Sequence, residues 1–418
     1  MRVILHGTGT EARAAAAHFS AARITDVQVT DDNGGTIDGL KSLSVDRAIE
    51  TVRDATYLRS PGVRPDHPLA LAAADKASCA TTPTGYWLAR HAPAETITIT
   101  GTKGKSTTVS LTSLLLKTLG LSASAYGNIG TPALNDLLPT DAFPIVEMSS
   151  YMLHDVPPAE HFHVITNLLQ DHIDWHGGLA PYHRAKLRPF FINAHPTGLA
   201  PRSVIDGHNL PSTIGALDEI VQSSDEALIL GQQTIPLQRT LKDFRTSPLR
   251  DGLRTALAIA DRLTTGRDLR AAAEQVMTTY PGLPSRQEHI PSTDERIWIN
   301  DALATVPEAV IEAVKPFISR EVVLLIGGAD RQQVFDPLKR FLEAHRNVSV
   351  IAFGSAGRRF GTQDATFTDT FNEALALASE RCPIGGAIIF SPAAPSEPPY
   401  TDYKQRAEVF KAAAQSAS

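Results

Sequence analysis

The sequence predicts an α/β fold of three domains, each with a mostly parallel sheet flanked by helices. Short apolar runs alternate with helical patterns along the chain, which is the order expected of parallel strands joined by helical crossovers. The 418 residues exceed the roughly 250–300 that a single core serves. Glycine-rich turns follow two of the predicted strands. We therefore expect domains at residues 1–93, 94–282 and 283–418.

The first domain opens on a strand, "RVILH", followed by a helix over residues 10–22 and a second strand in "DVQVTDD". The turn Gly7-Thr8-Gly9-Thr10 joins the first strand to the helix, and Asp31 follows about 20 residues later. This spacing is typical of a Rossmann-like nucleotide site, although it does not say which nucleotide binds. The alternative is a tight turn in which the glycines serve backbone geometry only.

The second domain begins with a strand over residues 96–100, a short glycine loop and a helix over 106–120, which is a P-loop NTPase-like order. Backbone N–H groups, the helix dipole and Lys105 favour a polyphosphate there, and Ser106 offers a hydroxyl to Mg²⁺. A helix cap rich in Ser and Thr is the alternative, but a cap requires neither glycine nor lysine. The residues expected to bind ATP are Gly101, Thr102, Lys103, Gly104, Lys105, Ser106 and Thr107.

Three downstream positions could complete this site. Glu147 ends the strand in "PIVEMSS", where a carboxylate would face the ligand crevice of an open sheet, although it could equally be a solvated loop acid. His172 lies in "QDHIDWH", a cluster that could bind a metal, orient a substrate or form a polar turn. Lys186 lies in the basic helix "YHRAKLRPF", and from sequence alone we interpret it as a solvated lysine. Residues 190–250 are polar and give no clear pattern.

The third domain shows four strands, in "RIWIND", "EVVLLIGG", "VSVIAFG" and "GAIIFSP", and predicts a second Rossmann-like sheet. Arg331, Ser391 and Ser396 follow strand ends that share one sheet edge, where they could contact a substrate carboxylate. Arg286, taken alone, is more typical of a surface charge.

The composition limits the classes of function. A net charge of −6 argues against a general nucleic-acid binder, and no apolar run is long enough to span a membrane. Only Cys79 and Cys382 occur, which excludes a disulfide framework and fits a cytoplasmic protein without a signal peptide.

The ordered motifs resemble the Mur ligase family, the ATP-dependent amino-acid ligases of peptidoglycan assembly. The motifs are "GTKGKSTT", "GNIGTPAL", "VEMSSY", "TNLLQDHIDWHG", "YHRAKL", "LPSRQE", "WIND", "IGGADR" and "FSPAAPS" followed by "YTDYKQRAEVF". The chain is most similar to the branch that joins glutamate to UDP-N-acetylmuramoyl-L-alanine. "SSY", "DWHG" and "GGADR" resemble the variant that adds L-glutamate and works beside a glutamate epimerase.

The resemblance implies ATP and two Mg²⁺ ions, and it gives roles to individual positions. Lys105 and Ser106 would hold the ATP phosphates and Mg²⁺, and Glu147 would lie near the first Mg²⁺. His172 and Lys186, the latter carbamylated on its amine, would support the second Mg²⁺. The substrate residues would be Gly7, Thr8, Gly9, Thr10 and Asp31 for the uridine diphosphate and Asn128 for the muramoyl part, and Ser60, Ser149 and Ser150 would also bind the substrate. Arg286 and Asp301 would contact ATP, and Arg331, Ser391, Ser396 and Tyr403 would receive the glutamate.

The implied reaction passes through an acyl phosphate, which the amine of glutamate attacks after the third domain closes, in a protein expected to be monomeric. One departure from the family keeps other functions open. Relatives carry a His-Asn pair before the late helix of the middle domain, whereas this chain reads "RTSPLRDGLRTALAIA". The alternatives are a ligase for a different carboxylate and amino acid in secondary metabolism, a nucleotide-binding pseudo-ligase, and an NAD-linked oxidoreductase suggested by Gly7, Gly9 and Asp31.

Overall fold

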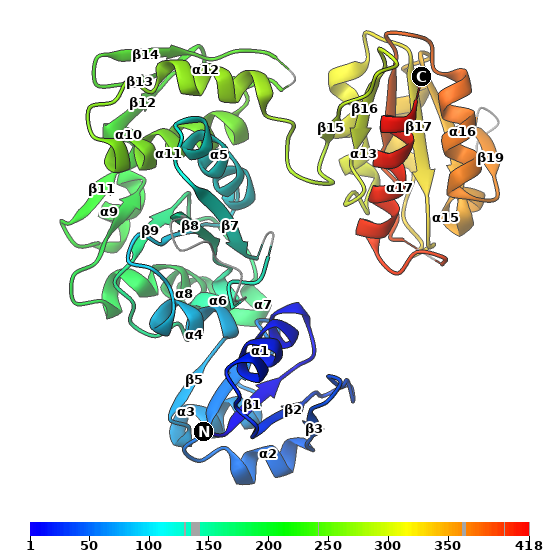
Figure 1. The fold of residues 1–418 in the computed structure, drawn as a ribbon. Helices are drawn as coiled ribbons and strands as arrows, with labels where there is room; N and C mark the ends of the chain where they lie inside the picture. The colour runs from blue at the N-terminus through cyan, green and yellow to red at the C-terminus, as the bar shows by residue number, and fades with distance from the viewer. Residues whose placement is uncertain (129–130, 135–142, 241, 362–364, 397, 418) are drawn as a thin grey trace. The chain divides into compact units, whose positions relative to one another are not determined.

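The computed structural model describes residues 1–128, 131–134, 143–240, 242–361, 365–396 and 398–417 (Figure 1). Ile129 and Gly130 of the "GNIG" motif therefore lie outside the described residues. The chain forms two compact units, Met1–Tyr280 and Pro281–Ser418. The division of the first unit into two domains stays a prediction, although this unit contains two separate parallel sheets.

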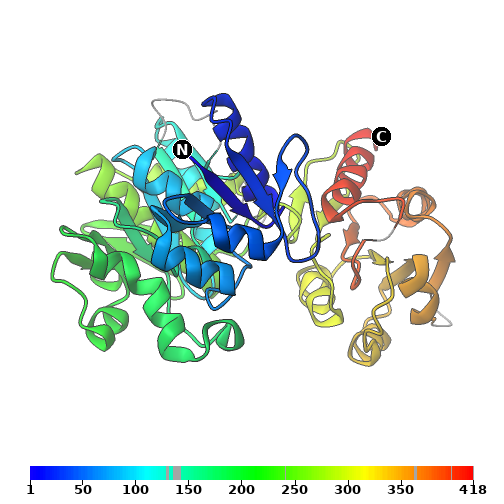
Figure 2. The same ribbon diagram turned by 90° about the horizontal axis from the view of Figure 1, so that it is seen from below.

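The first sheet is parallel, with strand order β3-β2-β1-β4-β5. Its strands are β1 (Val3–His6), β2 (Val27–Thr30), β3 (Lys41–Ser42), β4 (Thr56–Arg59) and β5 (Cys79–Thr81). Its helices are α1 (Thr10–Ala21), α2 (Val45–Thr51), α3 (Pro68–Lys76) and α4 (Pro83–Arg90). The core containing Leu5 and Phe19 packs α1 and α4 on one face, and the core containing Tyr57 and Leu69 packs α2 and α3 on the other (Figure 2).

The second sheet is also parallel, with strand order β11-β10-β9-β6-β8-β7. Its strands are β6 (Ile97–Thr100), β7 (Ala123–Gly127), β8 (Phe143–Glu147), β9 (Phe162–Ile165), β10 (Thr197–Ala200) and β11 (Ile214–Ala216). The chain leaves β6 for one side of the sheet and later returns to build the other side. Ligands of open α/β sheets bind at such a switch point, outside the carboxyl ends of the strands.

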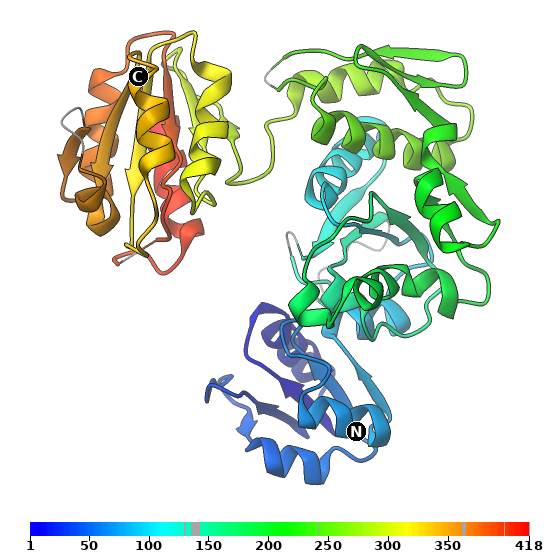
Figure 3. The same cartoon turned by 180° about the vertical axis from the view of Figure 1, so that it is seen from behind.

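Helices cover both faces of this sheet. They are α5 (Lys105–Thr118), α6 (Ser150–Leu153), α7 (Ile173–His176), α8 (Leu179–Ile192), α9 (Arg202–His208), α10 (Leu217–Ile220), α11 (Ser247–Thr264) and α12 (Arg270–Thr279). Buried leucines of α5 and α11 share one core, so the helix that follows the glycine loop is firmly anchored. Helices α6, α7 and α8 lie beside the first sheet, as the opposite views in Figures 1 and 3 both show.

A small antiparallel sheet was not predicted from the sequence. Its strands are β12 (Val221–Ser223), β13 (Ala227–Leu230) and β14 (Gln233–Pro236). Leu228 and Ile235 point into the core under α11, while Gln222 and Thr234 are exposed. Part of the polar segment that gave no pattern is thus a half-buried sheet, whose strands are too short to show a clear alternation.

The second unit contains a six-stranded sheet with order β15-β16-β20-β17-β18-β19, in which only β15 is antiparallel. The four predicted strands are present, and β15 and β19 are two more. The strands are β15 (Glu288–Ile290), β16 (Ile297–Asn300), β17 (Val322–Gly327), β18 (Val348–Phe353), β19 (Ala365–Thr368) and β20 (Ala387–Phe390). The helices are α13 (Pro307–Val314), α14 (Asp336–Glu343), α15 (Gly354–Phe360), α16 (Phe371–Arg381) and α17 (Tyr403–Ser416), with a 3₁₀ turn at Lys315–Phe317.

These sheets confirm the predicted α/β class of mostly parallel sheets flanked by helices. Within the part of the chain that the structure describes, no helix combines the length and apolar character that crossing a membrane requires.

Candidate functional site

The glycine loop joins β6, at the switch point of the second sheet, to α5. Gly101 has φ of +149°, and a Cβ built there would lie 1.9 Å from the Thr166 hydroxyl, so only glycine fits. Asn167 braces the loop, because its Oδ1 accepts from the Lys103 N–H at 2.9 Å and its Nδ2 donates to the Lys103 carbonyl at 3.1 Å. Gly104 precedes α5 in the left-handed region, which turns the loop into the helix N-terminus. The loop therefore has the rigid glycine geometry of a phosphate cradle, with Ser106 and Thr107 in the first turn of α5.

Two lysines meet at one carbonyl of this loop. Lys105 Nζ lies 3.0 Å from the Gly101 oxygen and 3.0 Å from the Thr102 oxygen. Lys186 Nζ, which comes from α8, lies 2.7 Å from the same Gly101 oxygen and 3.4 Å from the Thr100 hydroxyl. Lys186 is 2% exposed, so the interpretation of this residue as a solvated lysine is wrong.

The environment of Lys186 favours the neutral amine. Burial and then the positive charge of Lys105 lower the pKa of Lys186 from its ordinary value to about 7, although Asp171 and Glu147 act in the opposite direction. Lys186 Nζ lies 5.1 Å from the centroid of the Tyr182 ring, a contact that favours the charged form and so acts against this shift. A lysine amine that is substantially neutral near pH 7 is a nucleophile.

Glu147 ends β8, next to the strand that carries the loop, with Ile99 of β6 as its partner in register. Its side chain is 1% exposed. The Asn128 amide donates to Oε1 at 2.8 Å, while Oε2 is buried and has no hydrogen-bond partner among the described residues. A buried carboxylate oxygen without a partner is costly, and a cation would satisfy it.

His172 lies after β9, on the other side of the loop strand, and precedes α7 with φ of +49°. Its Nδ1 lies 3.0 Å from the Tyr151 hydroxyl. Its neighbour Asp171 pairs with Lys103 of the loop at 3.1 Å. The hydrogen bond of the Tyr182 hydroxyl to the Thr102 hydroxyl, at 3.0 Å, joins α8 to the same loop.

The other members of the cluster at 171–176 turn away from a common ligand. Asp174 is exposed, and its carbonyl accepts from Arg64 at 3.1 Å. The His176 ring packs edge-on against Trp175 and Tyr182. Burial, followed by the charge of His154, lowers the pKa of His176 to about 4, so this imidazole is neutral. His172 is thus the member of the cluster that remains available to a metal.

The fold therefore brings together, near the ends of adjacent strands, five residues that are spread over about 80 positions of the sequence. They are Lys105, Ser106, Glu147, His172 and Lys186. A carboxylate, a serine hydroxyl and an imidazole are ligand types that suit Mg²⁺ or Mn²⁺. Ser149 and Ser150 follow Glu147 closely at the C-terminal end of β8. Ser149 caps α6 by accepting from the Met152 N–H at 3.2 Å, and Ser150 is buried.

A second cavity, of about 470 Å³, opens at the C-terminal edge of the first sheet. Gly7 and Gly9 lie in its wall, and Thr10 begins α1 next to it. Gly7 has φ of +98°, and a Cβ there would come within 2.4 Å of the Ser60 hydroxyl. The Ser60 oxygen is buried and has no hydrogen-bond partner among the described residues, so it can serve a ligand.

Asp31 stabilises the same cavity. It accepts from the Thr8 hydroxyl at 3.1 Å and from the backbone N–H groups of Asn33 and Gly35. Burial alone raises the pKa of Asp31, but these hydrogen bonds outweigh it and lower the pKa. Asp31 therefore holds the loop in shape as a carboxylate, in addition to any contact with a ribose.

Beside it, His6 and His67 both face Asp32, a group that sequence reasoning missed. Among the described residues, these three form a group of His and Asp side chains that could hold a metal ion, because their potential ligand atoms all lie within 4.8 Å of one another. His67 Nδ1 accepts from the Leu69 N–H at 3.2 Å, which leaves its proton on Nε2, 3.2 Å from Asp32 Oδ1. Burial and His67 lower the pKa of His6, whose Nε2 lies 3.4 Å from the same oxygen. Two neutral imidazoles that donate to one carboxylate explain the group without a metal.

Arg59 joins the two sheets of the first unit and was also missed. It is 1% exposed and forms a bidentate pair with Asp155, at 2.6 and 2.9 Å. It also donates to the Tyr151 carbonyl at 2.7 Å. The Trp175 indole N–H reaches the Gly62 carbonyl at 3.4 Å. The loop that lines the second cavity is therefore bonded to α6 and α7, next to His172.

In the second unit, Asp301 follows β16 and Ser391 follows β20, its neighbour. The Ser391 hydroxyl donates to Asp301 at 2.6 Å, and the Gln287 N–H donates at 3.0 Å. Ser391 is fully buried, so its hydroxyl serves Asp301 in this arrangement. Arg286 and Arg331 are exposed, and Ser396 and Tyr403 are half-buried near the ends of β20 and the start of α17.

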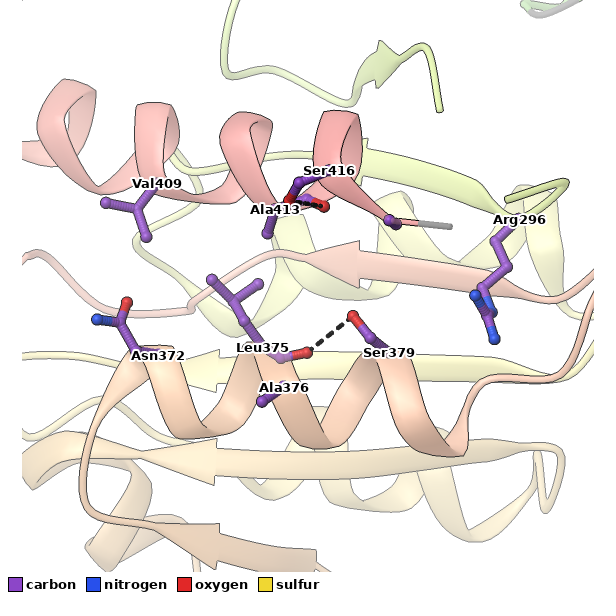
Figure 4. Close-up of a pocket in the computed structure, with 9 residues that line it drawn as sticks. Arg296, Asn372, Leu375, Ala376, Ser379, Val409, Ala413 and Ser416 are labelled. Carbon is purple, nitrogen blue, oxygen red and sulfur yellow. Dashed lines mark hydrogen bonds between the residues drawn. The ribbon is translucent and has the colours of Figure 1, made fainter. Parts of the chain in front are cut away.

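The unit also has a cavity of about 530 Å³ between α16 and α17 (Figure 4). Leu375, Val409 and Ala413 form much of its lining, and Arg296 at its end pairs with Asp294 at 2.8 Å. None of the predicted site residues lines it. It is a gap between helices and not the predicted amino-acid site.

Comparisons with known proteins identify a family and several relatives. The family model "Mur ligase middle domain" matches residues 99–205. The UDP-N-acetylmuramoyl-L-alanine–L-glutamate ligase of Salinispora tropica is 30% identical, over 98% of this chain and 96% of that protein. The ligase of the same name from Xanthomonas oryzae pv. oryzae is 30% identical over 98% of this chain and 94% of its own length.

Solved structures are similar in fold. A UDP-N-acetylmuramoyl-L-alanyl-D-glutamate–2,6-diaminopimelate ligase superposes with a TM-score of 0.54 at 18% identity, covering 87% of this chain and 93% of its own. The UDP-N-acetylmuramate-alanine ligase of Thermotoga maritima gives a TM-score of 0.53 at 16% identity, covering 98% of both chains. At these identities the likeness concerns the fold alone.

Proposed function

The chain belongs to the Mur ligase family, and from this membership we propose that it is an ATP-dependent ligase that joins L-glutamate to UDP-N-acetylmuramoyl-L-alanine. The products would be the lengthened peptide precursor of peptidoglycan, ADP and phosphate. The observation that carries the proposal in the structure is the buried Lys186 amine at the Gly101 carbonyl, because a phosphate loop alone has no use for a second, neutral lysine.

Lys105 and the backbone of residues 101–107 would bind the ATP phosphates, with α5 directing its N-terminus toward them. Lys105 now donates to two loop carbonyls, so its ammonium is already held at the loop. It would offset negative charge as the substrate carboxylate attacks the γ-phosphate and an acyl phosphate forms.

Mg²⁺ fits the donors present, since the buried Oε2 of Glu147 has no partner among the described residues and Ser106 follows the loop lysine directly. Glu147 and Ser106 would hold one ion, and His172 with a carbamylated Lys186 would hold the other. When bound, the two ions would neutralise charge on the transferring phosphoryl group.

Lys186 would carry the carbamate. Its neutral amine attacks CO₂, so that a new N–C bond forms, one C=O π bond becomes a C–O⁻ bond, and the nitrogen loses a proton to solvent; the neutral amine becomes an anion. The new negative charge would attract the Lys105 ammonium and supply oxygen ligands for a metal.

The cavity of the first sheet would bind the uridine diphosphate end of the substrate, with the backbone at Gly7–Thr10 near the diphosphate and the Ser60 hydroxyl available as a partner. Asn128 and Ser149 would lie toward the muramoyl part. The roles of Arg286, Asp301, Arg331, Ser391, Ser396 and Tyr403 toward ATP and glutamate stay predictions. We also expect a cytoplasmic monomer that works beside a glutamate epimerase.

The test is a coupled product assay with ATP, Mg²⁺, UDP-N-acetylmuramoyl-L-alanine and either glutamate enantiomer. We expect ADP and a product heavier by one glutamyl residue with L-glutamate. Both should be lost in Lys105→Ala and kept in Lys117→Ala, a change at an exposed lysine in the last turn of the same helix. No ADP with any substrate would refute ligase activity, and ADP formation with another carboxylate or amino acid would favour the different acyl substrate.

A further inference from the structure

We propose that Tyr151 is a positioning residue for His172. Its hydroxyl accepts the Nδ1 proton of the imidazole, so that the lone pair of Nε2 is presented to the metal. This inference rests on the proposed function, because it assumes that His172 is a metal ligand.

The geometry of the pair is direct. The Tyr151 oxygen lies 3.0 Å from His172 Nδ1, within hydrogen-bond length. Nε2 lies 3.9 Å from Asp171 Oδ2, which is beyond that length. Asp171 is engaged at 3.1 Å with Lys103 instead. Nδ1 is thus the nitrogen that the protein holds, and Nε2 is the one left to a ligand.

Tyr151 is itself held at both ends. Its carbonyl accepts from the buried Arg59 at 2.7 Å. Its ring lies 4.3 Å from the Trp175 ring, centroid to centroid, and 5.1 Å from the His172 ring. A hydroxyl on a ring fixed in this way can orient a side chain that is itself 47% exposed and would otherwise rotate.

The hydrogen bond matters because it fixes the tautomer of the imidazole. A neutral imidazole has one N–H and one lone pair, so a metal bound at Nε2 requires the proton on Nδ1. Metal-ligating histidines generally donate that proton to a carboxylate, a backbone carbonyl or water, and loss of the partner typically weakens metal binding about 10- to 100-fold. Here the acceptor is a neutral phenol, which adds no negative charge beside the phosphates.

The test uses the full chain and Mn²⁺ as a probe of the divalent site, in buffer with bicarbonate. We would compare wild type, Tyr151→Phe, His172→Ala and the double variant, following free Mn²⁺ by electron paramagnetic resonance. Tyr151→Phe removes only the hydroxyl and keeps the carbonyl that Arg59 binds. Tyr86→Phe is the matched control, since Tyr86 lies in α4 and loss of its hydroxyl should leave Mn²⁺ affinity unchanged.

We expect His172→Ala to weaken Mn²⁺ binding, and Tyr151→Phe to weaken it by about 10- to 100-fold in the wild-type background but to cause no further loss when added to His172→Ala. Long-range ¹⁵N NMR of the Mg²⁺-bound protein should place the His172 proton on Nδ1 in wild type. Unchanged Mn²⁺ affinity in Tyr151→Phe, an equal loss in both backgrounds, or a proton on Nε2 would each overturn the proposal. These readouts involve no turnover, so a failure of the ligase assay would be distinguishable from a failure here.

Discussion

Lys186 should titrate near neutrality, and this can be measured independently of turnover. With a pKa of about 7, a large part of the amine is neutral at pH 7.5, whereas an ordinary lysine with a pKa of about 10.4 would be roughly 0.1% neutral. Only the neutral form attacks CO₂. Burial and the charge of Lys105 therefore raise the reactive fraction roughly several hundred-fold over that of a surface lysine.

The assay is ¹³C NMR of the protein in ¹³C-bicarbonate at fixed dissolved CO₂, in which a carbamate on a lysine gives a separate carbonyl signal. We expect one signal that is absent in Lys186→Met and that already rises with pH through the neutral range. The sign follows from the lowered pKa, since the ammonium predominates below pH 7 and the amine above it.

Lys105→Met gives a second, directional check. Removing the neighbouring positive charge should raise the pKa of Lys186 and move the rise to higher pH, whereas Lys117→Met, at the far end of the same helix, should leave it in place. A signal that rises only near pH 10, or one that persists in Lys186→Met, would refute the reasoning.

Three further changes test other parts of the first unit. Glu147→Gln should lower Mg²⁺-dependent ADP formation by at least about 100-fold without lowering the thermal midpoint, because it neutralises a buried carboxylate; a lower midpoint with normal activity would contradict this. Gly7→Ala should weaken binding of the UDP substrate in calorimetry by at least about tenfold and destabilise by about 1–3 kcal/mol, whereas Gly39→Ala, with positive φ but open space, should bind normally. Arg59→Met should lower the free energy of unfolding by about 3 kcal/mol in urea titrations, because it leaves Asp155 without its buried partner; a change below about 1 kcal/mol would count against it.

The fold was predictable where the sequence pattern is strong. The strand before Gly7 is a mostly apolar run and the strand before Gly101 alternates Ile and Thr; both end at a glycine, and the structure places β1 and β6 there. The sheet formed by β12, β13 and β14 was not predictable, because three- and four-residue strands carry too few positions for an alternation to stand out. Its burial depends on α11, which comes later in the chain.

The site was predictable only in part, for a similar reason. Glycine, lysine and serine in a strand–loop–helix order identify a phosphate loop because local backbone geometry requires them. Nothing local marks Lys186 as buried, since the basic helix around it looks like a solvated face. Its environment is formed by Gly101, 85 residues earlier, and only the resemblance to a family indicated its role. Tyr151 and Arg59 were missed for the same reason, because their partners are distant in sequence.

Because two lysines lie at one carbonyl, we expect one of them to stay charged and the other to be neutral. Gly101 is an acceptor for both Nζ atoms, at 3.0 Å from Lys105 and 2.7 Å from Lys186, so two full positive charges there would repel each other in a largely buried space. Lys186 is 2% exposed and Lys105 is half-buried, and burial lowers the pKa of Lys186. Under the proposed function the loop lysine would remain the cation that a phosphate requires, and the helix lysine would supply the amine that reacts with CO₂. Exchanging the burial of the two positions would leave the loop without its cation, so the proposed carbamate belongs on the lysine of α8 and not on that of the loop.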